Sequence, residues 1–592
     1  MLNQITAKIA LMLPLRLTSY VPRPTSYVPR LLSLLLILYF WANGLANLDR
    51  FPKIHEDEAW QAAPGYTFWA EGYFGTELFA GFYGMEKHYY GFMPLFPIMV
   101  GAALHLFGMG LFQARLVPLM LIILTLALTY RLGSKLFSPW PGTLAVAVLV
   151  SWRIAAPFAH LASGIPMVDV ARITRYDSAV PVFGLLALLL LVSHIPAKAE
   201  TWALSSNPSP STSHLLPFFP PLSRGGNEKM LPYFAIGLLA GLAALSHVYG
   251  AFWLPALASA MVWRLGRRAI RPGLAIGVGC GLALTPWLIF VASGWSDFLG
   301  QSRNYTDRFG LLDVRFYVMN LLTEVERYDP LLNGAKESLG AWLWLIICSL
   351  SLSWLARRAF SQQGGQDGSL SYSTGSAQIL VIVLGVMAGL FALLLSFKTF
   401  TYLATLWPLL AIALAAGFRH VWQARTTWRW RRPFLLVVFL VAMSEGILAN
   451  WGLQTLAQQA TPYRVYTQII AAKLGPNHRI MGLQHYWLGL AEQRRSYRSI
   501  LVPIFWTSPQ YVPEPISFGQ AAQAIPPQVM LLDQIMLDFL SDTANPAHDL
   551  HALGLGIWAY LEQRQARLMA EFEDPTYGRL QIYQLQADEP GR

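Results

Sequence analysis

The chain has 592 residues, of which 55% are hydrophobic and only 13% are charged, whereas about 25% are charged in ordinary soluble domains. A mean hydropathy of +0.41 over this length excludes a single water-soluble core, since such cores stop growing near about 250–300 residues. The net charge is +11, but Lys and Arg cluster between apolar segments, which argues against a nucleic-acid-binding protein. The composition predicts a polytopic membrane protein.

Apolar segments long enough to cross a bilayer recur along the chain up to residue 450. A membrane-crossing helix needs about 20 mostly apolar residues. The first segment is not a cleavable signal peptide, because it starts late, lacks a small-residue cleavage site and is followed by further segments. The predicted segments are residues 31–47, 92–108, 115–131, 142–162, 178–194, 231–246, 249–263, 272–293, 341–356, 377–396, 401–418 and 433–450.

Clusters of Lys and Arg predict the orientation of these segments. Cytoplasmic loops carry an excess of both residues, so we place the N-terminal tail, residues 1–30, and three later basic connections in the cytoplasm. Residues 48–91, 294–340 and everything after 450 then lie outside. The basic residues are Lys8, Arg16, Arg23 and Arg30 in the tail, then Arg264, Arg267, Arg268 and Arg271, then Arg357 and Arg358, and finally Arg419, Arg425, Arg429, Arg431 and Arg432.

The number of crossings stays open at this stage. Residues 48–91 and 172–177 are both placed outside, which requires an even number of crossings between them, yet three apolar segments intervene. Either one segment does not cross or one of them is two short helices. The total is therefore eleven or thirteen, and we favour thirteen.

Two features of the membrane part receive no chemical role. Residues 197–230 are rich in Pro and Ser, which predicts a flexible cytoplasmic insertion. The only cysteines, Cys280 and Cys348, lie in apolar segments and offer neither a disulfide framework nor zinc-ligand spacing. We expect them to be small buried hydrophobic residues.

The composition becomes more polar after about residue 450. Residues 451–592 combine strand-like runs with helical patterns and turn signals, which predicts a small extracytoplasmic α/β domain. It contains no Gly-rich nucleotide-binding loop, so the function is expected in the membrane part, residues 31–450. The candidate strands are Arg479–Leu483, Ile500–Ile504, Val529–Asp533 and Leu580–Leu585.

Charged residues near a membrane are costly and therefore informative. Residues 55–58 (His-Glu-Asp-Glu) follow the first segment, and residues 86–88 (Glu-Lys-His) precede the second. Either group has a simpler explanation as solvated loop charges, and the aromatic residues around them suit an interfacial belt. Together, however, the two groups could meet over a cavity at the outer leaflet.

Three later pairs of residues fall on the same predicted outer side. Taken singly they have ordinary explanations, as a helix-end ion pair, a satisfied histidine and a snorkelling lysine. Their convergence on one face of a hydrophobic protein suggests a site, and residues 294–340 are a candidate cover over it. The pairs are Arg175 and Asp177, with Arg172 just before them, His247 and Tyr249, and Lys398 and Tyr402.

Several short motifs, in this order, resemble the GT-C glycosyltransferases that use lipid-linked sugars, in particular the protein O-mannosyltransferase and aminoarabinose transferase branch. Asp57-Glu58 resembles the Asp-Glu signature, and Glu86-Lys87 is similar to a Glu-Lys-Pro-Pro element, with His88-Tyr89 replacing the prolines. The other matches are Ala114–Pro118, Arg131–Phe137, Arg175-Tyr176-Asp177 for an Arg-x-Asp element, His247 in the place of a Thr-Lys-Gly turn, and Lys398 with Tyr402 and Trp407-Pro408 for a Lys/Arg-Tyr-Pro element.

The resemblance implies transfer of a sugar from a polyprenyl-phosphate donor to an acceptor hydroxyl at the extracytoplasmic face, with inversion. Inversion requires a carboxylate base, for which we take Asp57, supported by Glu58 and Glu86. The departing lipid phosphate requires positive charge. The residues expected at the phosphate are Lys87, Arg175, Lys398 and Tyr402, and those expected to bind substrate are His55, His88, Asp177, His247 and Tyr249.

The resemblance also implies partners and a location. The protein would be a hexosyl- or pentosyltransferase of the cell envelope in the bacterial inner membrane, acting on a glycan, lipid or protein acceptor. No cofactor is certain, and the metal is unknown. A divalent cation held by His55, Asp57, Glu86 or His88 stays open, since oxygen and imidazole ligands suit several metals.

Two other functions remain as alternatives. A transporter or flippase of lipid-linked or small solutes would place ionisable residues near the middle of its helices and often has an internal repeat. A non-catalytic relative could act as a membrane scaffold. The charges of this chain lie at one membrane boundary, and it retains Asp57 and Glu86-Lys87, which favours the enzyme.

Overall fold

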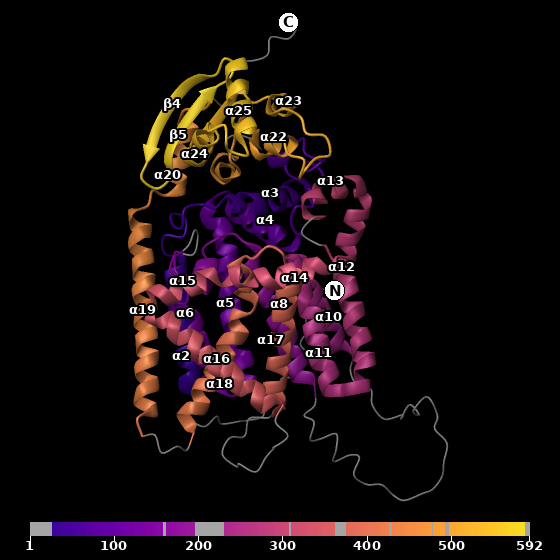
Figure 1. The fold of residues 1–592 in the computed structure, drawn as a ribbon, viewed down its shortest axis with the longest axis vertical. Coiled ribbons are helices and arrows are strands. Elements are labelled where there is room, and N and C mark those ends of the chain that lie inside the picture. Colours follow the sequence, from indigo (N-terminus) through magenta and orange to yellow (C-terminus); the bar gives the residue numbers. More distant parts are fainter. Residues whose placement is uncertain are drawn as a thin grey trace, which may run out of the picture.

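The computed structural model describes residues 27–157, 162–195, 230–306, 310–360, 374–424, 429–475, 477–491 and 496–586. These residues form a tall helical bundle capped at one end by a small sheet (Figure 1). Seven of the described helical segments are long and apolar enough to cross a membrane, as expected for an integral membrane protein. The predicted insertion at 197–230 falls almost entirely outside the described residues, as does most of the N-terminal tail.

The helices of the first half are, in chain order, α2 (Tyr27–Leu45), α3 (Glu56–Glu71), η2 (Glu77–Phe79), α4 (Leu95–Phe107), α5 (Leu111–Leu136), α6 (Pro139–Ser151), α7 (Pro166–Val170), η3 (Tyr176–Ser178), α8 (Val180–His194), α10 (Leu231–Ser246), η4 (Val248–Phe252), α11 (Trp253–Leu265), η5 (Gly266–Ala269) and α12 (Ile270–Ser293). Those that follow are α13 (Trp295–Thr306), α14 (Val314–Leu322), η6 (Thr323–Tyr328), α15 (Asp329–Glu337), α16 (Leu339–Phe360), α17 (Thr374–Leu394), η7 (Phe400–Thr405), α18 (Trp407–Gln423) and α19 (Arg431–Gln459).

Helix α4 is not a crossing. The Arg115 side chain, near the start of α5, donates to the Leu48 carbonyl just after α2 at 2.9 Å, so the chain leaves α2 and enters α5 at the same end of the bundle. Between them, α3 and α4 pack together at that end (Figure 1). Their backbones touch, because a Cβ on Gly65 would lie 1.7 Å from the Pro97 carbonyl oxygen.

The number of crossings follows from this arrangement. Arg172 also bonds to carbonyls at the end of α2, so α5 and α6 alone carry the chain across and back before residue 172. Eleven helices of the described chain then remain as candidate crossings, the lower of the two predicted totals. They are α2, α5, α6, α8, α10, α11, α12, α16, α17, α18 and α19.

The C-terminal part forms a five-stranded mixed sheet with helices around it (Figure 1). The strand order is β2-β1-β3-β5-β4. Strands β1, β2 and β3 are parallel, with Ile480 opposite both Tyr497 and Val529, whereas β5 runs antiparallel to β3 and β4. The elements are α20 (Tyr463–Ala472), β1 (Ile480–Gly482), η8 (Gln484–Tyr486), α21 (Trp487–Leu490), β2 (Tyr497–Ser499), α22 (Leu501–Trp506), α23 (Phe518–Gln523), β3 (Val529–Asp533), α24 (Gln534–Asp542), α25 (His551–Gln563), β4 (Arg567–Asp574) and β5 (Gly578–Gln584).

The predicted α/β character of this region is confirmed, with three differences in detail. The strand predicted at Ile500–Ile504 is helix α22, and the strand lies just before it. Strand β4 was not predicted, because its residues are largely exposed and charged. The boundary predicted at residue 450 falls inside α19, which continues to Gln459.

The C-terminal part is seated directly on the first connection of the membrane part. Trp506 donates through its indole Nε1 to the Gly81 carbonyl at 2.9 Å, and the Lys53 ammonium lies 3.4 Å from the Tyr577 carbonyl. Aromatic contacts, including Phe82 with Trp506, surround these bonds. The two parts therefore share one interface over α3 (Figure 1).

Candidate active site

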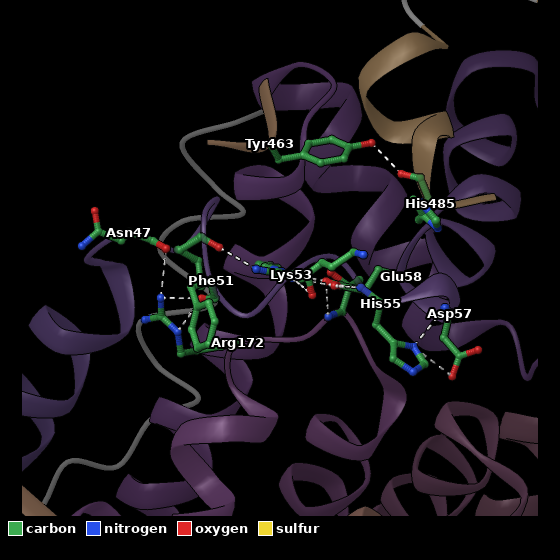
Figure 2. A network of polar contacts seen from close by, with 12 residues as sticks. Asn47, Phe51, Lys53, His55, Asp57, Glu58, Arg172, Tyr463 and His485 are labelled. Carbon is green, nitrogen blue, oxygen red and sulfur yellow. Dashed lines mark hydrogen bonds and ion pairs between the residues drawn. The ribbon is translucent and has the colours of Figure 1, made fainter. Parts of the chain in front are cut away.

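The start of α3 presents Asp57 at the end of the bundle nearest the sheet. His55 is the N-cap, and its Nδ1 accepts from the Asp57 backbone N–H at 3.1 Å. The Glu58 carboxylate in turn accepts from the His55 backbone N–H at 2.9 Å, which completes a capping box. Acidic residues are favoured in the first turn of a helix, and His55 also lies 3.6 Å from Asp57 Oδ2 through Nδ1 (Figure 2).

A chain of charged and polar groups leads from Asp57 into the bundle. Arg175 lies 3.3 Å from Asp57 Oδ2 through NH1 and 3.0 Å from Asp177 Oδ2 through Nε. The Tyr249 hydroxyl donates to the other Asp177 oxygen at 2.8 Å. Asp177 is fully buried and Arg175 nearly so, whereas the Asp57 side chain is 28% exposed. Asp57 is thus the accessible carboxylate of this cluster.

Aromatic side chains from three connections close the cluster on one side. The rings of Tyr176 and His247 are stacked with centroids 4.0 Å apart, and the Tyr176 hydroxyl lies 3.2 Å from that of Tyr402. Tyr249 packs against Tyr402 with centroids 5.0 Å apart. The structure therefore brings together five residues expected from the sequence around Asp57, namely Arg175, Asp177, His247, Tyr249 and Tyr402.

The Glu58 carboxylate is bound by Arg115 and not by this cluster, so the geometry does not support the expected catalytic role. Its carboxylate is fully buried and receives Arg115 in a two-pronged pair at 2.8 and 2.6 Å. It also accepts from the Thr174 backbone N–H at 2.9 Å. Burial alone would raise the pKa of Glu58, but Arg115 and the other donors outweigh burial and lower it. Glu58 is an ionised link between α3, α5 and the segment that carries Arg175.

A second buried arginine fixes the turn that leads into α3. Arg172 donates to backbone carbonyls of the segment between α2 and α3, including that of Asn47 at 3.0 Å and that of Phe51 at 2.8 Å. Figure 2 shows these bonds beside the His55 cap. Because a guanidinium offers five N–H donors, one side chain satisfies carbonyls that the end of α2 leaves unpaired.

The second acidic group of the loop does not join Asp57. Glu86 accepts from the Gly81 backbone N–H at 3.1 Å within its own loop. His88 pairs through Nδ1 with Asp297 of α13 at 3.0 Å, and Lys87 is exposed. In the described residues no bond or ion pair connects these three to Asp57, so their expected direct roles are not supported by the geometry.

Lys398 is buried in a separate ion cluster. Its ammonium lies 2.8 Å from Glu324 Oε2, and the same carboxylate binds the buried Arg327 at 2.8 Å. The Phe391 ring links this cluster to the site, since it lies under Arg327 and packs against Tyr249 with centroids 5.4 Å apart. Part of the expected cover, residues 294–340, thus engages the expected phosphate-binding lysine.

The described residues do not fit a bound divalent cation. They contain no group of three or more His, Cys, Asp or Glu side chains arranged to hold a metal. Of the expected ligands, only His55 and Asp57 are neighbours, with 3.6 Å between Nδ1 and Oδ2. Arg175 already faces the same Asp57 oxygen, so a cation there would meet a guanidinium.

His247 is expected to stay uncharged during catalysis, because burial and the nearby Arg175 lower its pKa to about 3. It lies in the turn between α10 and η4. We therefore expect the pH–rate profile of His247→Gln to have the same shape as that of the wild type between about pH 5 and 9, once both are scaled to their maximal rates. An ordinary histidine, with a pKa of about 6.5, would titrate within this range. An inflection near neutral pH that is lost in the variant would contradict this assignment.

No family model and no curated protein sequence matches this chain. Solved structures do match its fold. ArnT from Cupriavidus metallidurans, bound to undecaprenyl phosphate, superposes with a TM-score of 0.53 at 15% identity over 96% of this chain and 100% of that one. The archaeal oligosaccharyltransferase AglB from Archaeoglobus fulgidus, in complex with an inhibitory peptide and a dolichol-phosphate, gives 0.52 at 12% identity over 95% and 75%.

A further structure of the A. fulgidus oligosaccharyltransferase, in complex with zinc and sulfate, gives a TM-score of 0.51 at 12% identity, over 93% of this chain and 73% of that one. The expected helical membrane architecture is confirmed over nearly the whole chain: this protein shares the fold of ArnT and of the archaeal oligosaccharyltransferase.

Proposed function

We propose that the protein is an integral-membrane glycosyltransferase that moves a sugar from a polyprenyl-phosphate donor to an acceptor hydroxyl, with inversion. The observation that carries this proposal is the meeting of Asp57 with Arg175 at the accessible end of the cluster. A carboxylate accepts the proton of the attacking hydroxyl, and an adjacent cation stabilises the departing phosphate. Both groups are in place at one end of the bundle.

The residue roles follow from the contacts. Asp57 is the general base, and Arg175, held in orientation by Asp177, is the cation nearest to it. Lys398 is a second phosphate-binding candidate, and it becomes available when its ammonium exchanges the Glu324 carboxylate for a phosphate. Tyr402 shapes the wall of the site between them.

The donor and acceptor classes rest on the chemistry of the site and on what the structural neighbours bind. ArnT was solved with undecaprenyl phosphate, and AglB with a dolichol-phosphate and a peptide. We propose the same donor class here, with a hexose or pentose as the sugar and a glycan, lipid or protein as the acceptor. No resident metal is required by this proposal.

The proposed orientation follows from charge. Arg267 lies in η5, Arg358 in the last turn of α16 and Arg432 in the first turn of α19. These helix ends point away from the sheet (Figure 1), and the cytoplasmic side of a membrane protein carries such residues. We therefore place the N-terminus in the cytoplasm and the site and sheet outside, in a bacterial inner membrane. Labelling of a cysteine at position 57 from the cytoplasmic side only would overturn this orientation.

The transporter alternative is not favoured by the described part of the chain. It calls for ionisable side chains that line a path near the middle of the helices. Glu445 lies well inside α19, but it caps α16 by accepting from the Ser338 hydroxyl and from the Gly340 backbone N–H at 2.9 Å. Its carboxylate is used as a helix cap.

The proposed function is tested by offering the purified protein undecaprenyl phosphate that carries glucose, mannose, arabinose or aminoarabinose. We expect binding of at least one donor and its slow consumption, with water or an added glycan as acceptor. Release of undecaprenyl phosphate, measured by mass spectrometry, reports the transfer. A wild-type protein that binds none of these lipids in nanodiscs would contradict the proposal.

A further inference from the structure

Three buried polar groups near Asp57 have no hydrogen-bond partner. They are the indole Nε1 of Trp60, the amide Nε2 of Gln61 and the hydroxyl of Tyr89. The side chains of Gln61 and Tyr89 are fully buried. Native proteins pair nearly all such groups, so three unpaired groups in one neighbourhood point to a partner that the chain itself does not supply.

The geometry of α3 places two of these groups on the face of Asp57. Side chains three and four positions apart are neighbours on a helix, so Trp60 and Gln61 lie one turn beyond Asp57. The Oε1 atom of Gln61 accepts from the Tyr176 backbone N–H at 3.0 Å, which fixes the amide and leaves its N–H groups without a partner. Gln61 is thereby tied to the residue next to Arg175.

The Phe92 ring lies beside two of the three groups, those of Trp60 and Tyr89, and beside Tyr176. Its centroid lies 5.6 Å from that of Trp60, 6.2 Å from that of Tyr89 and 5.7 Å from that of Tyr176. The Trp60 indole N–H and the Tyr89 hydroxyl lie close enough to interact, but their geometry does not make a hydrogen bond. Burial above all, and Asp57 in addition, raise the pKa of Tyr89 well above its ordinary value, so the phenol keeps its proton and can donate.

This neighbourhood is closed by α13. Gln301 accepts from the Tyr90 backbone N–H at 2.8 Å and donates to the His88 carbonyl at 2.6 Å. The Tyr305 hydroxyl lies 3.4 Å from the Gly91 carbonyl. These bonds hold α13 against the segment that carries Tyr89.

The hydrogen-bonding chemistry of the three groups indicates which class of ligand they could bind. An indole N–H, an amide NH₂ and a phenol are uncharged, and together they present several donors beside aromatic rings. An anion would call for Lys or Arg among them, and a cation for carboxylates. Hydroxyl groups of an uncharged ring match them best, and a site built to bond hydroxyls discriminates strongly between sugars.

We propose that Trp60, Gln61 and Tyr89 form a subsite that recognises hydroxyl groups of the transferred sugar, beside the carboxylate of Asp57. The inference rests on the proposed function and adds to it the residues that select the sugar. The same hydroxyl chemistry could come from an acceptor glycan, and the experiment separates the two sources.

The test uses Tyr89→Phe in the full-length protein. The variant removes one unpaired hydroxyl and keeps the ring, so its melting temperature should not fall. We expect the Kd for the undecaprenyl-phosphate sugar that the wild type consumes to rise about tenfold, the effect of one lost hydrogen bond. The Kd for undecaprenyl phosphate without a sugar should stay unchanged. Tyr577→Phe, which removes another buried unpaired hydroxyl, should change neither value.

Each outcome decides the inference. A loss confined to the sugar-bearing lipid supports it. An equal loss for both lipids, or no loss for either, overturns it, and so does slower transfer with unchanged donor binding, because that result assigns the hydroxyl to the acceptor. A wild-type protein that binds neither lipid overturns the proposed function instead, which keeps the two failures distinct.

Discussion

Asp57→Asn is expected to abolish most sugar transfer, lowering kcat by roughly 100- to 10,000-fold, the usual contribution of a general base. The amide keeps the shape of the carboxylate but cannot accept the proton of the attacking hydroxyl. Arg175 retains its bond to Asp177, and the His55 cap accepts from the Asp57 backbone N–H. Folding and donor binding should therefore survive. Single-turnover release of undecaprenyl phosphate measures the effect.

Glu56→Gln is the matched control for this variant. Glu56 is the neighbouring acidic residue in the first turn of α3, and its side chain has no bond to the cluster among those the structure describes. It should transfer sugar at nearly the wild-type rate. Full activity in Asp57→Asn, or an equal loss in Glu56→Gln, would remove Asp57 from the role of base.

The second large effect is expected on stability. Glu58→Gln leaves the fully buried guanidinium of Arg115 without its charged partner, and breaking a buried ion pair in this way costs about 3–5 kcal/mol. Arg115→Met should destabilise the protein by a similar amount. The midpoint of thermal unfolding in detergent measures both changes, and transfer activity should fall with them, because Glu58 also bonds to the Thr174 backbone next to Arg175.

The double variant Glu58→Leu with Arg115→Met tests whether the unpaired buried charge causes this loss of stability. Replacing both charges by apolar groups removes the uncompensated charge, so the double variant should unfold at a higher temperature than either single variant. Glu571→Gln, which breaks an exposed ion pair with Arg579, should change the midpoint little. Single and double variants that behave like this surface control would show that the Glu58–Arg115 pair does not stabilise the fold.

Most residues of the cluster around Asp57 could be predicted from the sequence, because membrane topology tells at which end of the bundle each connection lies. Once the basic connections were assigned to one side, Arg175, His247 and Tyr402 had to lie at the other end of the bundle. The structure places them together there. Which of these side chains contact one another was not predictable, because topology gives the position of a residue along the bundle but not the direction in which its side chain points.

The same reasoning was wrong where neighbours in sequence diverge in space. Asp57 and Glu58 are adjacent on a helix with 3.6 residues per turn, so their side chains point about 100° apart and only one can face the site. Glu86 and His88 lie near the membrane, but the loop that carries them turns at Gly81 and Gly84, both with positive φ. Proximity to a membrane segment was therefore a weaker guide than helix geometry.

Two residues that organise the site carried a signal that could have been used. Arg115 lies near the start of an apolar helix, and Arg172 lies in a short connection, where an isolated charge must find a partner. Their partners, Glu58 and the carbonyls around Phe51, are far away in sequence. Only the packing of α2, α3 and α5 shows which partner each one takes.

The contact between the C-terminal sheet and the first connection has a consequence for biosynthesis. Gly81 and Lys53 are bonded by Trp506 and Tyr577, which leave the ribosome hundreds of residues later. The segment that carries Asp57 therefore lacks these contacts on one side while the helices of the bundle are inserted. The contacts that cover the segment carrying Asp57 form late in synthesis, after α19 has been made.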